Sequence, residues 1–339
     1  MKQEFTSSRP FIVTSALLMT LVSSMALATD GTWRTSATRS DWSDTTKWID
    51  DEIASGVGAT ATFDREYYAT GRYIVLDTDR TIGQIQNINT YNGVGKNIII
   101  EVSNGSLLTM NNGANDAIIN NSGDGAVRID PTISLLSNLK VTNTTSTFLS
   151  INAVSSGSGL KNITLGTSDN RINLSGSISD GAGQIAIIVD TGSLNVPVNF
   201  LASNTFSGDI TIHSGTATTN TSTSNLGTGN IDLLGGRLDM NNANSIASAA
   251  ILNFNLAASI ELNYAGAMTI GGLTSGLNTI SNGTYDISEL NTHFGTTSFS
   301  GTGLLTIAAV PEASQYGILL GCLLGGFTIV RRRHTPSKR

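Results

Sequence analysis

Trp33, Trp42 and Trp48 are the residues near the start of the sequence whose type and spacing could do chemistry. Ser and Asp residues lie between them in the segment TWRTSATRSDWSDTTKW, residues 32–48. Exposed rings of this kind could stack on sugar faces while neighbouring carboxylates bind sugar hydroxyls. The alternative, which we favour, is that the rings cover the first turn of a repetitive fold and prevent another chain from pairing with its edge.

Carboxylates are too scattered to predict a glycosidase or lyase. Such a site needs at least two carboxylates, often with a basic residue, on one face of neighbouring elements. Residues 87–310 contain thirteen acidic residues, mostly isolated Asp at turns such as Asp124 and Asp180. The paired acids at 50–52 and 77–79 lie before this region. We therefore expect no enzyme and no catalytic residue.

Metal-binding patterns are equally weak. Residues 120–125 (NNSGDG) place oxygen ligands at loop spacing, but they lack the distal Glu of an EF-hand and occur once. A turn is the better interpretation. His213 and His293 stand far from each other, with no Cys between them. We expect neither a metal nor another cofactor.

The first 28 residues have the three zones of a secretory signal peptide. Lys2 and Arg9 lie in a polar lead, an uncharged stretch follows, and Ala26-Leu27-Ala28 ends it. Cleavage after Ala28 is expected, with the Sec translocon and signal peptidase as partners. The alternative is an uncleaved N-terminal anchor.

A second apolar segment closes the sequence. Residues 313–330 carry no charge, and Arg331, Arg332 and Arg333 follow directly. Eighteen residues are near the lower limit for a membrane-spanning helix, and an Arg triplet holds its end in the cytoplasm. We therefore predict one apolar helix here, with the preceding domain outside.

This C-terminal layout resembles the PEP-CTERM sorting signal. Val310-Pro311-Glu312, then Ser314, Tyr316 and Gly317, precede the apolar stretch and the Arg triplet. The resemblance implies a Gram-negative bacterium in which an integral-membrane exosortase cuts at the Pro-Glu motif and passes the protein to the cell surface or extracellular matrix. Ala313 stands where the family has a second Pro, so a plain anchor is the alternative.

Composition limits what the middle of the chain can do. Seven of the 19 Lys and Arg lie in the two ends, but only two of the 25 acidic residues do, so residues 29–310 carry a net charge of −11. Nucleic acid is excluded as a partner, because phosphate binding needs a basic surface. The same residues contain no Cys, so an exported domain must be stable without disulfides.

The middle also changes in composition along its length. Residues 29–86 contain sixteen charged residues, all three Trp and no Asn, whereas residues 87–310 contain nineteen charged residues and thirty-one Asn. We therefore divide it into an N-terminal cap, residues 29–86, and a body, residues 87–309.

Short β-strands recur through the body between Gly, Asn and Ser clusters. All-β is the expected class, because each run is short, β-branched or alternating, and bounded by turn formers. The clearest runs are 97–102, 106–110, 126–129, 163–165, 171–174, 184–189, 209–212, 231–234, 237–240 and 304–307.

A parallel β-helix is favoured over a β-sandwich. Residues 98–111 and 231–241 both run strand, Gly, Leu, Met, Asn, which suggests repeated coils. Asn, Thr and Ser at successive turns suit hydrogen-bonded ladders between stacked coils of roughly 20 to 25 residues.

Residues 204–241 resemble the autotransporter-associated β-strand repeat. Asn204-Thr205-Phe206-Ser207-Gly208, a strand, Ser214-Gly215, then residues 226–229 (LGTG) and a second strand carry the likeness. The resemblance implies a right-handed parallel β-helix on a bacterial surface. Residues 216–224 depart from the pattern with Thr, Asn and Ser, so we expect this coil to be loose. Residues 283–307 resemble the segment that precedes the sorting signal in such proteins, and we expect them to close the rod.

These patterns together predict a non-catalytic exported surface or matrix protein. The expected route runs through an inner-membrane intermediate. A carbohydrate-binding or adhesion module, with extracellular polysaccharide as its partner, is the main alternative, and a polysaccharide lyase or glycosidase is the less favoured one.

Overall fold

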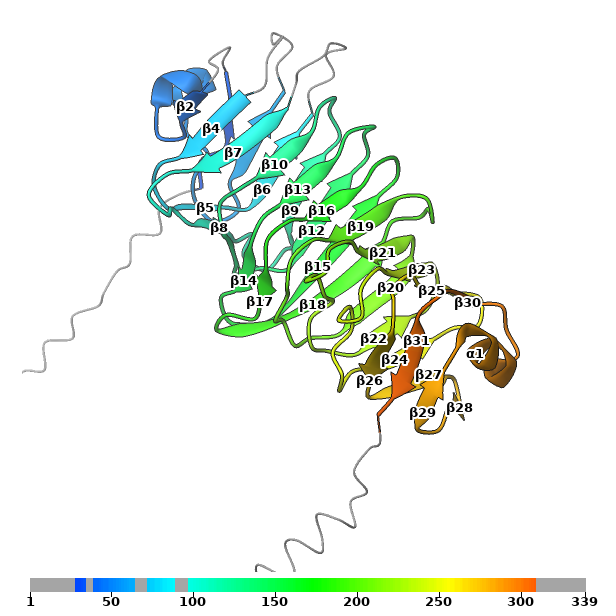
Figure 1. Cartoon of the computed structure of the whole chain (residues 1–339). Helices are drawn as coiled ribbons and strands as arrows, with labels where there is room; N and C mark the ends of the chain where they lie inside the picture. Colours follow the sequence, from blue (N-terminus) through cyan, green and yellow to red (C-terminus); the bar gives the residue numbers. More distant parts are fainter. Residues whose placement is uncertain (1–27, 35–38, 65–71, 89–96, 309–339) are drawn as a thin grey trace, which may run out of the picture.

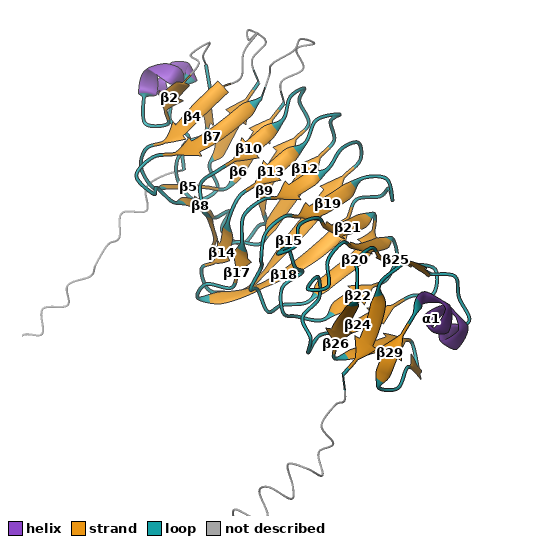
Figure 2. Ribbon diagram, in the orientation of Figure 1, coloured by secondary structure: helices purple, strands orange, loops and turns teal. Residues whose placement is uncertain are grey.

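The chain winds into a parallel β-solenoid. The computed structural model describes residues 28–34, 39–64, 72–88 and 97–308. Its coils stack into a rod with β2 (Arg39–Asp41) near one end and helix α1 (Ile287–Phe294) near the other (Figures 1 and 2). Neighbouring strands along the rod come from successive coils and run parallel. The predicted parallel β-helix is confirmed, and the β-sandwich alternative is wrong.

Two long sheets and one shorter sheet form the sides of the rod. The twelve-stranded sheet contains, in spatial order, β1 (Gly31–Thr32), β3 (Thr60–Phe63), β6 (Gln84–Asn87), β9 (Ala117–Asn121), β12 (Leu139–Asn143), β15 (Gly159–Thr167), β18 (Gly183–Asp190), β20 (Ile210–Ser214), β22 (Ile231–Leu233), β24 (Ile251–Phe254), β27 (Gly272–Ser275) and β28 (Asn278–Thr279). The eleven-stranded sheet contains β2, β4 (Arg72–Leu76), β7 (Ile98–Val102), β10 (Val127–Ile129), β13 (Leu149–Ile151), β16 (Ile172–Leu174), β19 (Pro197–Phe200), β21 (Thr216–Thr219), β23 (Arg237–Met240), β25 (Ser259–Leu262) and β30 (Phe299–Gly301).

The smaller sheets close the third side at each half of the rod. The five-stranded sheet contains β17 (Ile178–Ser179), β14 (Val154–Ser156), β11 (Ile133–Leu135), β8 (Leu108–Met110) and β5 (Arg80–Ile82). The three-stranded sheet contains β26 (Ala267–Ile270), β31 (Leu304–Ile307) and β29 (Gly283–Tyr285). Each of the ten strand runs expected from the sequence overlaps an observed strand.

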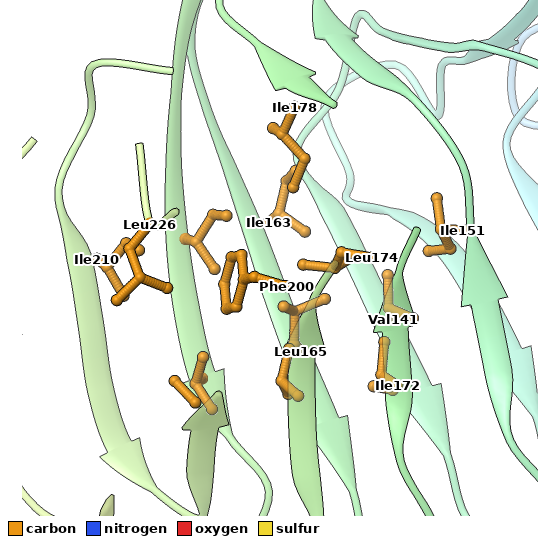
Figure 3. Close-up of a cluster of buried hydrophobic side chains, with 14 of the residues drawn as sticks. Val141, Ile151, Ile163, Leu165, Ile172, Leu174, Ile178, Phe200, Ile210 and Leu226 are labelled. Atoms are coloured by element: carbon orange, nitrogen blue, oxygen red, sulfur yellow. The ribbon is translucent and has the colours of Figure 1, made fainter. Parts of the chain in front are cut away.

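The core is a continuous column of aliphatic side chains inside the coils. Strand residues alternate between buried and partly exposed positions, as in β9 and β18, because successive side chains of a strand point to opposite faces. Figure 3 shows Leu165, Leu174 and Phe200 from successive coils gathered between the sheets. Full burial of a side chain of this size stabilises the fold by about 1.5–3 kcal/mol. A core of this length explains how residues 29–310 can fold without a Cys.

Buried asparagines form one of the ladders expected at the turns. Asn87 Nδ2 donates to Asn121 Oδ1 over 2.6 Å, and Asn121 Nδ2 donates to Asn143 Oδ1 over 2.9 Å. The three residues end β6, β9 and β12 and are at most 1% exposed. Amide groups on successive coils therefore satisfy one another where water is excluded. Further along the rod, Asn199 bonds to Asn173 and Asn220 bonds to Asn199, 26 and 21 residues apart in sequence.

The described residues between 29 and 86 join the same stack. β3 pairs with β6 and β6 with β9, so the twelve-stranded sheet continues from the predicted cap into the body without a break. The change in composition near residue 86 does not coincide with a break in the sheets. The first coils differ from the rest of the rod because they fold around a cluster of three Trp side chains.

The C-terminal segment packs over the last coils. α1 begins with a capping box, in which the Asp286 side chain accepts from the Glu289 backbone amide, and it ends at Gly295 with φ 62°. Phe294 on this helix contacts Phe254, with ring centroids 5.0 Å apart, and Phe299 of β30 completes the aromatic group. These rings cover the apolar end of the rod, as expected for residues 283–307.

The expectation of a loose coil at residues 216–224 is wrong for residues 216–219, whereas residues 220–224 form a turn outside the strands. Thr216–Thr219 form β21, which pairs in parallel with β19 on one side and β23 on the other. Thr216, Thr218 and Thr219 are at most 5% exposed. Threonine is β-branched and suits a strand, so the polar residues continue the sheet although they lack the apolar pattern of the repeat.

Candidate functional site

The three tryptophans lie inside the first coils. Trp33, Trp42 and Trp48 are 1%, 0% and 0% exposed. Trp48 packs edge-on against Trp33 at 5.0 Å and lies 5.2 Å from Trp42, measured between ring centroids. Trp48 Nε1 donates to the Trp42 carbonyl over 2.8 Å, and Trp42 Nε1 donates to the Ala54 carbonyl over 3.1 Å.

This packing corrects the sugar-platform interpretation of Trp33, Trp42 and Trp48. A pyranose ring needs an exposed aromatic face, and the three side chains present none. They belong instead to the hydrophobic core, where Trp42 also contacts Phe63 at a centroid distance of 6.5 Å. The rings close the first coils from inside.

Most residues of the two predicted processing signals lie outside the described part of the chain. Ala28 is exposed at the first described position. Ala26, the segment 313–330 and the sorting residues are beyond it: Pro311, Glu312, Arg331, Arg332 and Arg333. Within residues 28–34, 39–64, 72–88 and 97–308, no helix has the length and apolar character needed to cross a bilayer.

The predicted turn at residues 120–125 serves the asparagine ladders. Asn121 Nδ2 also contacts the Gly125 carbonyl at 3.2 Å, and Asn120 Nδ2 donates to Gln86 Oε1 over 3.0 Å. The side-chain oxygens of both residues also take part in contacts between coils, since Asn121 Oδ1 accepts from Asn87 and Asn120 Oδ1 accepts from Thr142. Among the described residues, no three His, Cys, Asp or Glu side chains gather as metal ligands would.

A polar groove on the outer face of the eleven-stranded sheet is the candidate site. We call it the outer-face groove; its volume is about 410 Å³. Strands β19, β21 and β23 form its floor, and residues 191–196, between β18 and β19, form a wall. The lining residues are Leu194, Asn195, Pro197, Asn199, Thr216, Thr218, Asn220, Arg237 and Asp239.

Strand register places the floor residues in two columns. Asn199 aligns with Thr218, and Thr218 aligns with Asp239. In the second column Pro197, Thr216 and Arg237 align in the same way. All six alternate with core residues along their strands, so the solenoid fold directs them outward.

An asparagine ladder crosses the groove. Asn199 Nδ2 donates to Asn173 Oδ1 over 2.8 Å, and Asn220 Nδ2 donates to Asn199 Oδ1 over 2.7 Å. Asn241 continues the column with a longer contact of 3.4 Å to Asn220. Each amide orients its neighbour, which makes the floor a fixed array of donors and acceptors.

The wall is attached to the floor by a hydrogen bond. Thr216 Oγ1 donates to the Leu194 carbonyl over 2.7 Å. Thr218, two residues further along β21, is 5% exposed. Within the described part of the chain, nothing hydrogen-bonds to the Thr218 hydroxyl.

Charged side chains mark one end of the groove. Arg237 Nη2 lies 2.7 Å from Glu261 Oε2 and 3.5 Å from Asp239 Oδ2. Asn263 Nδ2 bridges the two carboxylates, at 2.9 Å from Asp239 Oδ1 and 3.0 Å from Glu261 Oε2. Loss of hydration on burial, together with the charge of Glu261, raises the pKa of Asp239, although Arg237 and Asn263 act in the opposite direction.

Two carboxylates and an arginine on adjacent coils are the components of a glycosidase or lyase site. Of the two, only Asp239 lines the groove. Glu261 lies on the far side of Arg237 from the groove and is engaged by both Arg237 and Asn263. The arrangement presents one carboxylate to a ligand and suits binding better than acid–base catalysis.

A larger hollow of about 890 Å³ lies beside α1, and two of its polar side chains, Asn291 and Thr296, are engaged by neighbouring residues. Asn291 makes two hydrogen bonds with the Phe299 backbone, at 2.9 and 3.0 Å. Thr296 Oγ1 contacts Ser298 Oγ at 2.6 Å. No charged residue lines this hollow, so the outer-face groove is the better candidate.

Sequence reasoning missed the outer-face groove. Thr216 and Thr218 fell in the segment expected to be loose, and Arg237 and Asp239 were recognised only as part of a strand. The signal that was available is the alternation R-L-D-M at 237–240, which directs Arg237 and Asp239 to the same outer face.

Comparison of the chain with protein-family models, with curated proteins and with solved structures gives no significant match.

Proposed function

We propose that this chain is an exported, non-catalytic β-solenoid of a bacterial cell surface or extracellular matrix. The order of its segments supports the proposal: a signal peptide ending at Ala28, a rod without disulfides, and Pro311-Glu312 followed by an apolar stretch and an Arg triplet. The Sec translocon, signal peptidase and an exosortase would act on it in turn. Its action is mechanical or adhesive.

The solenoid suits this role because the contacts between its own coils stabilise it. The aliphatic column extends over many coils, two asparagine ladders each link several of them, and aromatic groups close the rod at both ends. Exposed sheet edges invite pairing with other chains, so closed ends favour a rod that stays separate. The outer-face groove favours carbohydrate binding as a second function.

Mass spectrometry of the mature termini tests the proposal. An N-terminus at Thr29 and a C-terminus near Pro311 are the expected results. Mature protein that keeps Arg331–Arg333 would reduce the C-terminal segment to an ordinary anchor and overturn the sorting step.

A pair of variants sharpens the test. Glu312→Gln should block removal of the C-terminal segment, because it alters the Pro-Glu motif. Ala313→Pro restores the second Pro of the family pattern and should increase the processed fraction. Equal processing of both variants and the parent chain would contradict recognition at this motif.

A further inference from the structure

We propose that the outer-face groove binds a neutral, hydroxyl-rich saccharide, with Thr218 and Asp239 as its contacts on the floor. The inference rests on the proposed surface location, where polysaccharide is accessible, and it identifies the site and the ligand class. The groove volume of about 410 Å³ lies within the range of roughly 300–1,000 Å³ that is common for small-molecule sites.

The Thr218 hydroxyl is the first argument for a ligand. The residue is 5% exposed and lines the groove, yet no described group pairs with its hydroxyl. Its neighbour Thr216 is satisfied by the Leu194 carbonyl at 2.7 Å. The Thr218 oxygen is not one of the described atoms that are buried without a partner, so it opens into the groove, where it can donate to or accept from a ligand hydroxyl.

The remaining floor groups supply both donors and acceptors. A carboxamide has two N–H donors and an oxygen with two lone pairs. The ladder uses one donor and one acceptor of Asn199, which leaves one of each. Asp239 Oδ2 has only the 3.5 Å contact with Arg237. Sugar hydroxyls both donate and accept, so they match a mixed set of this kind.

Charge and apolar lining narrow the ligand class. Arg237 is held by Glu261 at 2.7 Å, so Arg237, Asp239 and Glu261 together carry one net negative charge. This charge disfavours uronates, phosphates and other anions. Leu194 and Pro197 line the same groove and offer apolar contact to the C–H face of a sugar ring. A neutral saccharide meets all these conditions.

Affinity electrophoresis of the purified full chain tests the proposal directly. Gels would contain dextran, galactomannan or xyloglucan as neutral probes and polygalacturonate as the anionic probe. At least one neutral polysaccharide should retard the chain. Thr218→Val and Asp239→Asn should each weaken that retardation at least tenfold and keep the side-chain shape, because the first removes a hydroxyl and the second replaces a charged acceptor with a neutral amide.

A matched control and a blocking variant complete the design. Thr164→Val makes the same substitution on the outer face of β15 and should bind like the parent chain. Asn195→Trp fills the groove from its exposed wall, so it should abolish binding even if a floor variant fails to fold. Thermal unfolding of each variant verifies the fold.

Three results would overturn the proposal: no retardation by any neutral polysaccharide, unchanged retardation of all three groove variants, or preference for polygalacturonate. Binding in the gel does not depend on export or processing. A failure here is therefore distinct from a failure of the proposed surface function, which the mature termini report.

Discussion

Asn121 donates a hydrogen bond from Nδ2 to Oδ1 of Asn143 over 2.9 Å, and neither side chain is exposed to solvent. The side-chain oxygen Oδ1 of Asn121 accepts in turn from Asn87 Nδ2 over 2.6 Å, so the side-chain amide of Asn121 links three coils. Amides aligned in this way satisfy each other only while the coils stay in register. The ladder therefore fixes the register of the rod at this corner.

Asn121→Ala should lower the free energy of unfolding by about 1–3 kcal/mol, because it removes the buried hydrogen bonds that Asn121 makes with Asn87 Nδ2 and with Asn143 Oδ1. Asn278→Ala, at an exposed position of β28, is the matched control and should stay within about 0.5 kcal/mol of the parent chain. Guanidinium unfolding followed by circular dichroism measures both. Equal effects would show that the buried ladder adds no stability.

Trp42→Ala should destabilise the chain by about 3–5 kcal/mol, because it leaves a cavity under the first coils where Trp48 and Phe63 now pack. Removing Leu277, which is fully exposed at the β27–β28 turn, should have little effect. Acrylamide should quench the tryptophan fluorescence of the parent chain weakly, since all three rings are buried. Strong quenching would contradict the closed end.

The fold could be predicted because its signals are local and repeated. Alternation within strands and turn formers between them locate the strands, and Asn at successive turns indicates stacking. One argument was nevertheless wrong in detail. Residues 98–111 begin on the eleven-stranded sheet with β7, whereas residues 231–241 begin on the twelve-stranded sheet with β22. Their likeness reflects a strand–turn–strand corner and not equivalent positions in two coils.

The candidate site could not be predicted because it depends on register between coils. Asn199, Thr218 and Asp239 are about twenty residues apart and come together only when three strands align. Each looks like an ordinary strand residue by itself. The Trp residues show the opposite case. Their pattern is distinctive in the sequence, but their side chains are buried in the core and offer no surface to a ligand.

Gly229→Ala should destabilise the rod, because a Cβ at this position would lie 2.2 Å from the Gly208 carbonyl oxygen on the previous coil. Both glycines belong to the repeat at 204–241, one in each of two successive coils. Gly166→Ala, in β15 of the twelve-stranded sheet, is the control, since its Cβ would meet nothing closer than 3.4 Å. We expect a lower unfolding midpoint for the first variant and an unchanged or higher midpoint for the second. The reverse order would contradict close stacking at the repeat.

Asp239→Asn should stabilise the chain at neutral pH, because the native fold raises the pKa of this carboxyl above its unfolded value of about 3.9. The native state then holds its proton more tightly than the unfolded chain does, so ionisation costs stability as pH rises from the unfolded value through the native one. The asparagine variant lacks this cost. Its thermal midpoint, relative to the parent chain, should rise with pH across this window and then level off.

Thr218→Val changes the same groove without removing a titrating group, so the difference between its thermal midpoint and that of the parent chain should not vary with pH. A difference in thermal midpoint between Asp239→Asn and the parent chain that is constant from pH 3 to pH 7 would contradict the raised pKa. A difference that falls with pH would mean that Arg237 and Asn263 stabilise the charged carboxylate more than burial destabilises it.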